Sequence, residues 1–338
     1  MMYVVPRPRF HVFAGLSAER SRGPASGGGL RSTRRLARNR VVVDSANLTY
    51  PRHVTEEVDL LSRALGGAYR IFLFADYGGT LVPNGTESDV APPSLLLSRL
   101  EKLAGVDSVS LFVMSGKTVD DLDASLGLDG VGLIGQGGYE IRKPGGETVC
   151  PVNVGSARRL LHRLELEAHG TLSEYPGVRV DNKGFAVSVR HAACDRPLVG
   201  LVTRSFSGLV RSLDEHHQLE LLYRDDGVEA RLGGWRKGDA LRHILRDADP
   251  EDSLAICIGD DVTDEEAFEA VLEWSDDGAE DSIWMIGDPD SDEDAVPTAL
   301  PILVSPTPRP TLATLFVRGP HEVYEFLSSM SAVATALL

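Results

Sequence analysis

The sequence predicts an α/β fold, with a Rossmann-like parallel-sheet core and an inserted α+β domain. Short apolar runs bounded by turn residues alternate with segments whose apolar residues recur at helical spacing, as expected of buried parallel strands and the helices that cover them. In the middle of the chain this alternation gives way to two helices and two hairpins. The α/β pattern then resumes, so the middle segment is expected to be an insertion into one core.

The expected elements follow from these patterns in chain order. Helices are expected at 58–65, 95–103, 118–126, 160–164, 198–213, 239–245, 264–274 and 320–330. Core strands are expected at 71–75, 109–114, 131–134, 253–258 and 282–286, and hairpins at 178–189 and 219–232. The core is therefore expected to consist of residues 51–137 and 232–338, and the insertion of residues 138–231.

The charge is distributed unevenly along the chain. The net charge is −16, but residues 1–50 hold nine arginines and two acids and carry +7, which leaves −23 for residues 51–338. An acidic body of this kind repels nucleic acid and anionic membranes, so neither is expected as a partner. Residues 1–50 cannot bury much apolar surface and are expected to be a disordered extension. A transit peptide, an RNA-binding tail and a non-native extension are alternatives with the same composition.

The apolar runs and the cysteines indicate which classes of protein are not expected. No apolar run reaches the roughly 18 residues that a membrane helix needs, so an integral membrane protein is not expected. The three cysteines, Cys150, Cys194 and Cys257, are odd in number and scattered, which disfavours a disulfide framework and a cysteine-based zinc site. Both observations suit a reducing, cytoplasmic location.

Two polar clusters are expected at the ends of buried strands in the first half of the chain. Asp76 ends one strand and is followed by the turn residues Tyr77-Gly78-Gly79; a carboxylate there can ligate a hard cation or attack an electrophile. Ser115-Gly116-Lys117 follows the next strand, and its hydroxyl and turn amides can hold a phosphate oxygen. The plainer alternatives are a capped turn and an ordinary helix N-cap.

Two more clusters lie in the second half. Lys237 opens a helix, where a cation is unfavourable for the helix dipole, so an anionic partner is expected nearby. Asp260, Asp261 and Asp264 crowd the end of a buried strand, where like charges repel unless a cation such as Mg²⁺ neutralises them. A solvated lysine and a solvated acidic face are the alternatives, and the apolar residues on both sides of the cluster disfavour the second.

Together and in this order, these segments resemble the haloacid dehalogenase superfamily of aspartyl-phosphate hydrolases, and more closely the trehalose-6-phosphate phosphatase family. The family's Asp-Tyr-Asp-Gly-Thr-Leu opening is similar to residues 76–81, its Ser-Gly-Arg to 115–117, and its Gly-Asp-Asp-x-Thr-Asp-Glu to 259–265. Its Glu-x-Arg segment is similar to 229–231, ahead of Lys237. The resemblance covers about residues 58–330.

The resemblance implies a Mg²⁺-dependent phosphoric monoester hydrolase with a cap over its core. Asp76 would be the nucleophile, and Lys237 would neutralise it and the transferring group. The metal ligands implied are Asp76, Asp260 and the carbonyl of Gly78, with Asp261 or Asp264 supporting. The phosphate-binding residues implied are Ser115, Gly116 and Lys117. The insertion would be the cap, and the substrate-binding residues implied are Glu140, Lys183 and Glu229.

The sequence departs from the family most at Gly78. The family has an aspartate there, which protonates the leaving sugar oxygen and then activates water; proton transfer of this kind is typically worth about 10²–10⁴-fold. Glu140 and His191 are the expected substitutes if another residue carries the proton. The cap also departs, because the family's His-Gly reads Gly137-Gly138 and its usual Glu reads Asp181. The residues for sugar recognition therefore match the family less well than the residues for phosphate and metal binding.

Four interpretations stay open. The expected function is hydrolysis of a sugar phosphate, first of all trehalose 6-phosphate, slowed by Gly78. The alternatives are an impaired homologue that binds a sugar phosphate or a trehalose-phosphate synthase as a regulator, and a phosphatase of another sugar or glycerate phosphate. A dehalogenase-type reaction is disfavoured, because a metal-free dehalogenase does not need Asp260 and Asp264.

Overall fold

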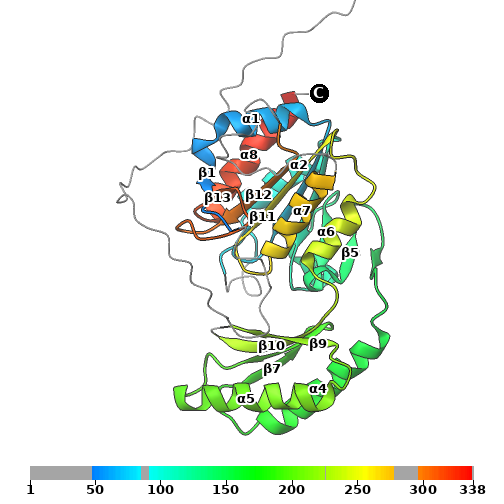
Figure 1. Ribbon diagram of the computed structural model, residues 1–338, viewed down its shortest axis with the longest axis vertical. Helices are drawn as coiled ribbons and strands as arrows, with labels where there is room; N and C mark the ends of the chain where they lie inside the picture. Colours follow the sequence, from blue (N-terminus) through cyan, green and yellow to red (C-terminus); the bar gives the residue numbers. More distant parts are fainter. Residues whose placement is uncertain (1–47, 85–90, 225, 278–295, 337–338) are drawn as a thin grey trace, which may run out of the picture.

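The computed structural model describes residues 48–84, 91–224, 226–277 and 296–336. Figure 1 shows a larger lobe above a smaller one, joined by the two chain segments that enter and leave the smaller lobe. The larger lobe is built on a nine-stranded sheet and the smaller one on a four-stranded sheet. Among the described helices, none combines the length and the apolar character that crossing a membrane requires.

The larger sheet has the strand order β1-β13-β12-β11-β2-β3-β4-β5-β6. In this order, each pair of neighbouring strands between β1 and β4 is parallel. β5 and β6 extend the sheet at one edge as antiparallel strands. The strands are β1 (Arg52–His53), β2 (Arg70–Asp76), β3 (Val109–Met114), β4 (Gly132–Gly135), β5 (Glu140–Arg142), β6 (Thr148–Val149), β11 (Ser253–Gly259), β12 (Ala299–Val304) and β13 (Leu315–Val317). This is the α/β class with a mainly parallel sheet that the sequence predicts.

Helices cover both faces of this sheet, which explains why its central strands are mainly apolar. Along β2, Leu73 and Ala75 belong to the core cluster on one face, and Phe72 and Phe74 to the cluster on the other. The helices on the first face are α1 (Val58–Gly67), α2 (Ser94–Ala104), α3 (Val119–Leu126) and α8 (Pro320–Ala336). Those on the second are α6 (Lys237–Leu245) and α7 (Glu265–Asp277).

The smaller lobe is an antiparallel sheet covered by two helices on one face. Its strand order is β7-β8-β10-β9, with β7 (Arg179–Asn182), β8 (Ala186–Arg190), β9 (Leu219–Tyr223) and β10 (Gly227–Leu232). Val187 and Val228 pack against α4 (Gly155–Leu172) and α5 (Arg196–Leu213). The alternate residues Ser188 and Glu229 lie on the opposite face, which in Figure 1 is turned toward the larger lobe.

The structure differs from the sequence expectations at the start of the insertion and in additional strands of the larger sheet. The insertion was expected to begin at residue 138, but β5 and β6 pair into the larger sheet, so residues 140–149 continue that sheet. Strands β12 and β13 were not expected from the sequence. The expected strand at 282–286 and the extension up to residue 47 lie outside the described residues.

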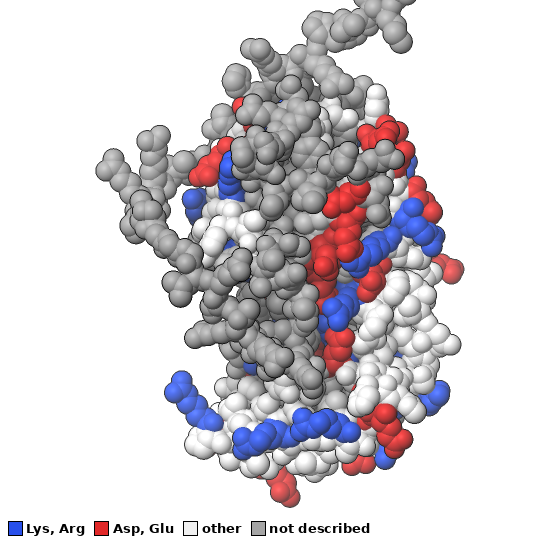
Figure 2. All heavy atoms as spheres, viewed as in Figure 1, with Lys and Arg blue, Asp and Glu red and all other residues white. Residues whose placement is uncertain are grey.

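Charged side chains form two groups on the face that Figure 2 shows. Acidic side chains gather on the larger lobe beside α6 and α7, where Arg242 forms ion pairs with Asp239 and Glu273. A row of basic side chains lies across the smaller lobe.

Candidate active site

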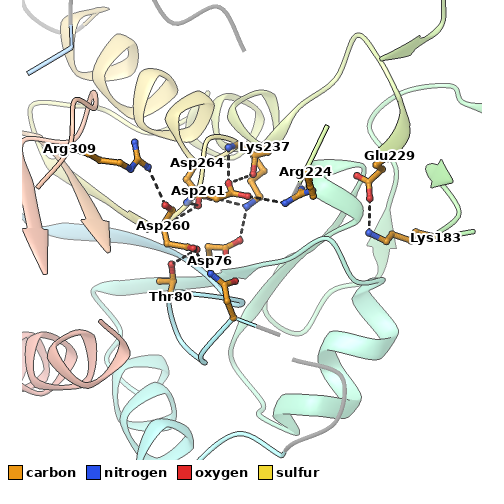
Figure 3. Close-up of polar contacts among 12 residues, drawn as sticks. Asp76, Thr80, Lys183, Arg224, Glu229, Lys237, Asp260, Asp261, Asp264 and Arg309 are labelled. Carbon is orange, nitrogen blue, oxygen red and sulfur yellow. Dashed lines mark hydrogen bonds and ion pairs between the residues drawn. The ribbon is translucent and has the colours of Figure 1, made fainter. Parts of the chain in front are cut away.

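Polar residues converge at the carboxyl edge of the larger sheet. Asp76 ends β2, Ser115 directly follows β3, and Asp260 directly follows β11. These strands are parallel neighbours, so their carboxyl ends lie at the same edge. Arg224, in the β9–β10 turn of the smaller lobe, reaches this edge and lies 3.5 Å from a carboxylate oxygen of Asp261. The smaller lobe therefore contacts the edge that carries the polar cluster (Figure 3).

Lys237 joins two of the carboxylates. Its Nζ donates to Oδ1 of Asp76 at 2.6 Å and to Oδ1 of Asp264 at 2.8 Å, and all three side chains are buried. Lys237 is the first residue of α6, so these carboxylates are the anionic partner that its place at a helix start predicts. Burial lowers the pKa of Lys237, but Asp264 and Asp76 outweigh it and hold that pKa well above its usual value.

Asp264 also shapes the loop after β11. Its Oδ2 accepts hydrogen bonds from the backbone N–H groups of Asp260 at 2.9 Å and Asp261 at 3.1 Å. A side chain at Gly259 would bring its Cβ to 2.3 Å from the Asp264 carboxyl carbon, so this position requires glycine. Both oxygens of Asp264 thus accept hydrogen bonds, Oδ1 from Lys237 and Oδ2 from the 259–264 loop.

The residues present fit a divalent cation. Carboxylate oxygens of Asp76, Asp260 and Asp264 all lie within 4.8 Å of one another. Burial, followed by the charge of Asp264, raises the pKa of Asp260 to about 6. Burial also raises the pKa of Asp76, with Asp264 and Asp261 adding to the effect and Lys237 opposing it. A hard cation with oxygen ligands, such as Mg²⁺, would relieve this excess of negative charge.

Asp261 does not point into this group. Its Oδ1 accepts from the hydroxyl of Thr263 at 2.6 Å and from the Thr263 backbone N–H at 2.7 Å. Its other oxygen faces Arg224. Asp261 therefore links the loop to the smaller lobe, whereas Asp260 receives hydrogen bonds from Asn84 at 3.0 Å and Thr80 at 3.4 Å on the side of Asp76.

The expected phosphate loop has an ordered geometry. The Oγ of Ser115 accepts from the backbone N–H of Lys117 at 3.2 Å. The Nζ of Lys117 donates to Ser125 at 3.2 Å and lies 5.1 Å from the centre of the Tyr77 ring. Gly116 has open space where a Cβ would lie. The loop thus presents a buried hydroxyl and backbone amides next to β2, and the ammonium of Lys117 lies over the residue that follows Asp76.

The expected substrate-binding residues lie in two places. Lys183 and Glu229 form an ion pair of 2.6 Å in the smaller lobe, which Figure 3 places apart from the aspartate cluster. Glu140 instead caps α3, because its Oε2 accepts from the backbone N–H of Val119 at 2.9 Å. His191 is buried, and no hydrogen bond or ion pair among the described residues joins it or Glu140 to Asp76.

Arg224 and Arg309 were missed from the sequence. Arg309 donates from Nη2 to the backbone oxygen of Asp260 at 3.1 Å and from Nη1 to Glu265 at 2.8 Å. Arg224 lies in the turn between β9 and β10 and Arg309 in the segment between β12 and β13, and neither position shows a periodic pattern. Only the tertiary structure brings them to the strand edge.

A model of the family described as trehalose-phosphatase matches residues 74–295, which is more than half of the chain. The chain belongs to the trehalose-phosphatase family. It is 30% identical over 231 residues to the trehalose-phosphate phosphatase of Mycobacterium marinum, covering 65% of this chain and 57% of that protein. It is 33% identical over 218 residues to the bifunctional trehalose-6-phosphate synthase/phosphatase of Thermoproteus tenax, covering 63% of this chain and 29% of that protein.

Several solved structures similar to this chain carry names related to trehalose. The C-terminal domain of trehalose-6-phosphate phosphatase from C. albicans aligns with a TM-score of 0.66 at 19% identity, covering 85% of this chain and 99% of that one. The C-terminal domain of the Candida albicans trehalose synthase regulatory protein aligns with a TM-score of 0.62 at 15% identity, covering 83% and 98%. These similarities confirm the fold. The chain spans about half the length of the Mycobacterium relatives it matches.

Proposed function

We propose that this protein is a Mg²⁺-dependent phosphatase that hydrolyses trehalose 6-phosphate through an aspartyl-phosphate on Asp76. The observation that carries the proposal is the group of Asp76, Asp260 and Asp264 at the carboxyl edge of the sheet, whose carboxylate oxygens lie within 4.8 Å of one another. The buried Lys237 pairs with Asp76 and Asp264 of this group. Membership of the trehalose-phosphatase family supports a sugar phosphate as substrate.

Each residue has a defined task in this proposal. Asp76 attacks phosphorus, so that a new P–O bond forms and the bond to the sugar oxygen breaks. Lys237 holds the carboxylate of Asp76 at 2.6 Å and supplies positive charge beside the transferring group. Ser115 and the amides of its loop bind the phosphoryl oxygens. A bound Mg²⁺ would let the anionic carboxylate approach an anionic phosphate.

The site has no assigned donor for the proton that the leaving group needs. The leaving sugar oxygen needs a proton, and Gly78 supplies none. Glu140 is occupied as the cap of α3, and His191 is buried in the smaller lobe. We therefore expect solvent water to supply the proton and turnover to be slow.

Phosphate release from trehalose 6-phosphate tests the proposal. Wild-type protein should release phosphate in the presence of Mg²⁺, and chelation of the metal should stop the release. A panel of other sugar phosphates and phosphoglycerate tests the alternative substrates. Failure with every one of these compounds would contradict the proposed activity.

The second candidate is a homologue with little or no activity that binds a sugar phosphate or a trehalose-phosphate synthase. Gly78 favours it, because this position lacks the acid/base group of the family. The variant Gly78→Asp separates the two candidates. Gly79 has a φ of 86°, but Gly78 is not among the described glycines with positive φ, so its backbone can accept a side chain.

If the rest of the site is competent, Gly78→Asp should raise phosphate release by on the order of 10²-fold or more. Gly66→Asp is a matched control, since it adds the same charge on α1, where a Cβ has open space. If wild type and Gly78→Asp are both inactive while the sugar phosphate still binds, the regulatory candidate is correct. Equal activity of both would place the proton donor elsewhere.

A further inference from the structure

Gln136 has an unusual backbone conformation at the end of β4. It directly follows the strand, only 7% of its surface is exposed, and its φ is 54°. Non-glycine residues rarely adopt this left-handed conformation, and strained residues of this kind cluster at functional sites. The next two residues are glycines, yet the chain places glutamine at the strained position. This arrangement indicates that the side chain itself has a use.

The side-chain amide of Gln136 lacks a partner. Its backbone N–H donates to the backbone oxygen of Lys117 at 2.6 Å. Across the described part of the chain, however, its amide nitrogen and oxygen make no hydrogen bond. Neither atom is among the fully buried side-chain atoms without a partner, so the amide is open to solvent. A glutamine amide offers both donors and acceptors, so it is free to bind a ligand at this place.

The side-chain amide of Gln136 lies between the strand edge that carries Ser115 and the smaller lobe that carries Lys183. β4 is parallel to β3, so Gln136 shares the strand edge with Ser115, and the backbone N–H of Gly137 donates to the backbone oxygen of Ser115 at 3.1 Å. On its other side the amide lies against the smaller lobe, where a Cβ on Gly184 would be 3.4 Å from its Nε2. Gly184 follows Lys183, whose Nζ pairs with Glu229 at 2.6 Å.

The facing wall of the smaller lobe carries a second unpaired polar group. Ser188 is 6% exposed, and its hydroxyl is buried without a hydrogen-bond partner. It pairs with Glu229 across the β8–β10 ladder and so lies on the same face of the sheet. That face is opposite the one that packs on α4 and α5. Unpaired polar groups therefore lie on both sides of the junction between the lobes.

We propose that Gln136 is a specificity-determining residue that hydrogen-bonds a hydroxyl of the sugar while its phosphate is held at Asp76 and Ser115. An amide suits this task because it can donate to and accept from a hydroxyl at once. The Lys183–Glu229 pair and Ser188 form the opposite wall of the same subsite. The inference rests on the proposed function and extends it to the recognition of the leaving group.

The test measures the activity of wild type and Gln136→Gly on trehalose 6-phosphate and on p-nitrophenyl phosphate. Gln136→Gly removes the amide and tolerates the positive φ, so the melting temperature should stay the same or rise. A lost hydrogen bond to the sugar should lower kcat/KM for trehalose 6-phosphate by about three- to tenfold. p-Nitrophenyl phosphate has no sugar hydroxyl, so its kcat/KM should not change. Gln218→Ala is a matched control, because Gln218 bonds Ser156 within the smaller lobe.

Equal losses for both substrates, or no loss for either, would overturn the inference. If the wild type releases no phosphate, the proposed function fails, and calorimetry with trehalose 6-phosphate then tests the inference by itself. Weaker binding to Gln136→Gly than to wild type and Gln218→Ala supports it. Equal binding by all three proteins, or no binding to wild type, overturns it.

Discussion

Replacing Lys237 with methionine removes the ammonium that two buried carboxylates share. Its Nζ lies 2.6 Å from Asp76 and 2.8 Å from Asp264, whose side chains are 9% and 0% exposed. Breaking a buried ion pair costs about 3–5 kcal/mol, because it leaves an unpaired charge. This loss of stability is limited, because the unpaired carboxylate can become neutral by taking up a proton. For an ordinary aspartate this uptake costs about 5 kcal/mol at about pH 7.5 and about 1.5 kcal/mol at about pH 5.

The effect of Lys237→Met should therefore depend on pH. In the variant, the folded-state pKa of the orphaned carboxyl lies above its unfolded value, so stability is lost as pH rises from about 4. We expect the free energy of unfolding to fall by about 3–5 kcal/mol relative to wild type at about pH 7.5, and by no more than about 1.5 kcal/mol at about pH 5.

Urea unfolding followed by circular dichroism in a chelating buffer measures both values. Lys102→Met on α2 is a control, because Lys102 is exposed and should change stability by no more than about 0.5 kcal/mol. A loss below about 1 kcal/mol at the higher pH, or an equal loss at both pH values, would refute the proposed pairing of Lys237.

Three further outcomes follow from the site. The pKa of Asp260 is about 6, so protons compete with Mg²⁺ for this carboxylate at low pH. Calorimetry should show Mg²⁺ binding that is about tenfold weaker at about pH 5 than at about pH 7.5. Mg²⁺ binding that does not depend on pH would contradict the assignment of Asp260 as a ligand. Arg224→Ala should lower kcat/KM by no more than about fivefold at low salt, with the difference lost at high salt, because the pair with Asp261 is half-exposed. Glu229→Gln should raise KM for the sugar phosphate and leave p-nitrophenyl phosphate unaffected; equal changes would argue against a role in sugar recognition.

Much of the fold could be predicted because its strands are buried on both faces. The run 109–114 is apolar except for Ser110, and β3 has these bounds. β12 escaped prediction because Pro301 interrupts it, and proline cannot donate to a ladder. In the structure Pro301 lies between β11 and β13 and still accepts a hydrogen bond from Thr314. β13 has three residues and is too short to show a period.

The site could be predicted in part for a similar reason. Residues at the ends of parallel strands converge, so Asp76, Ser115 and Asp260 could be grouped from the sequence. What could not be predicted is how each side chain is used. Asp261 turns to Thr263 and Arg224, and Glu140 caps a helix. Such choices depend on contacts between segments that are distant in sequence.

Phosphate release from trehalose 6-phosphate by wild type and Asp76→Asn tests the central claim most directly. The substitution keeps the size of the side chain but removes the nucleophilic carboxylate. We predict Mg²⁺-dependent release by wild type and none above background by Asp76→Asn, with the sugar phosphate still bound by the variant. Release by Asp76→Asn at the wild-type rate would contradict the account.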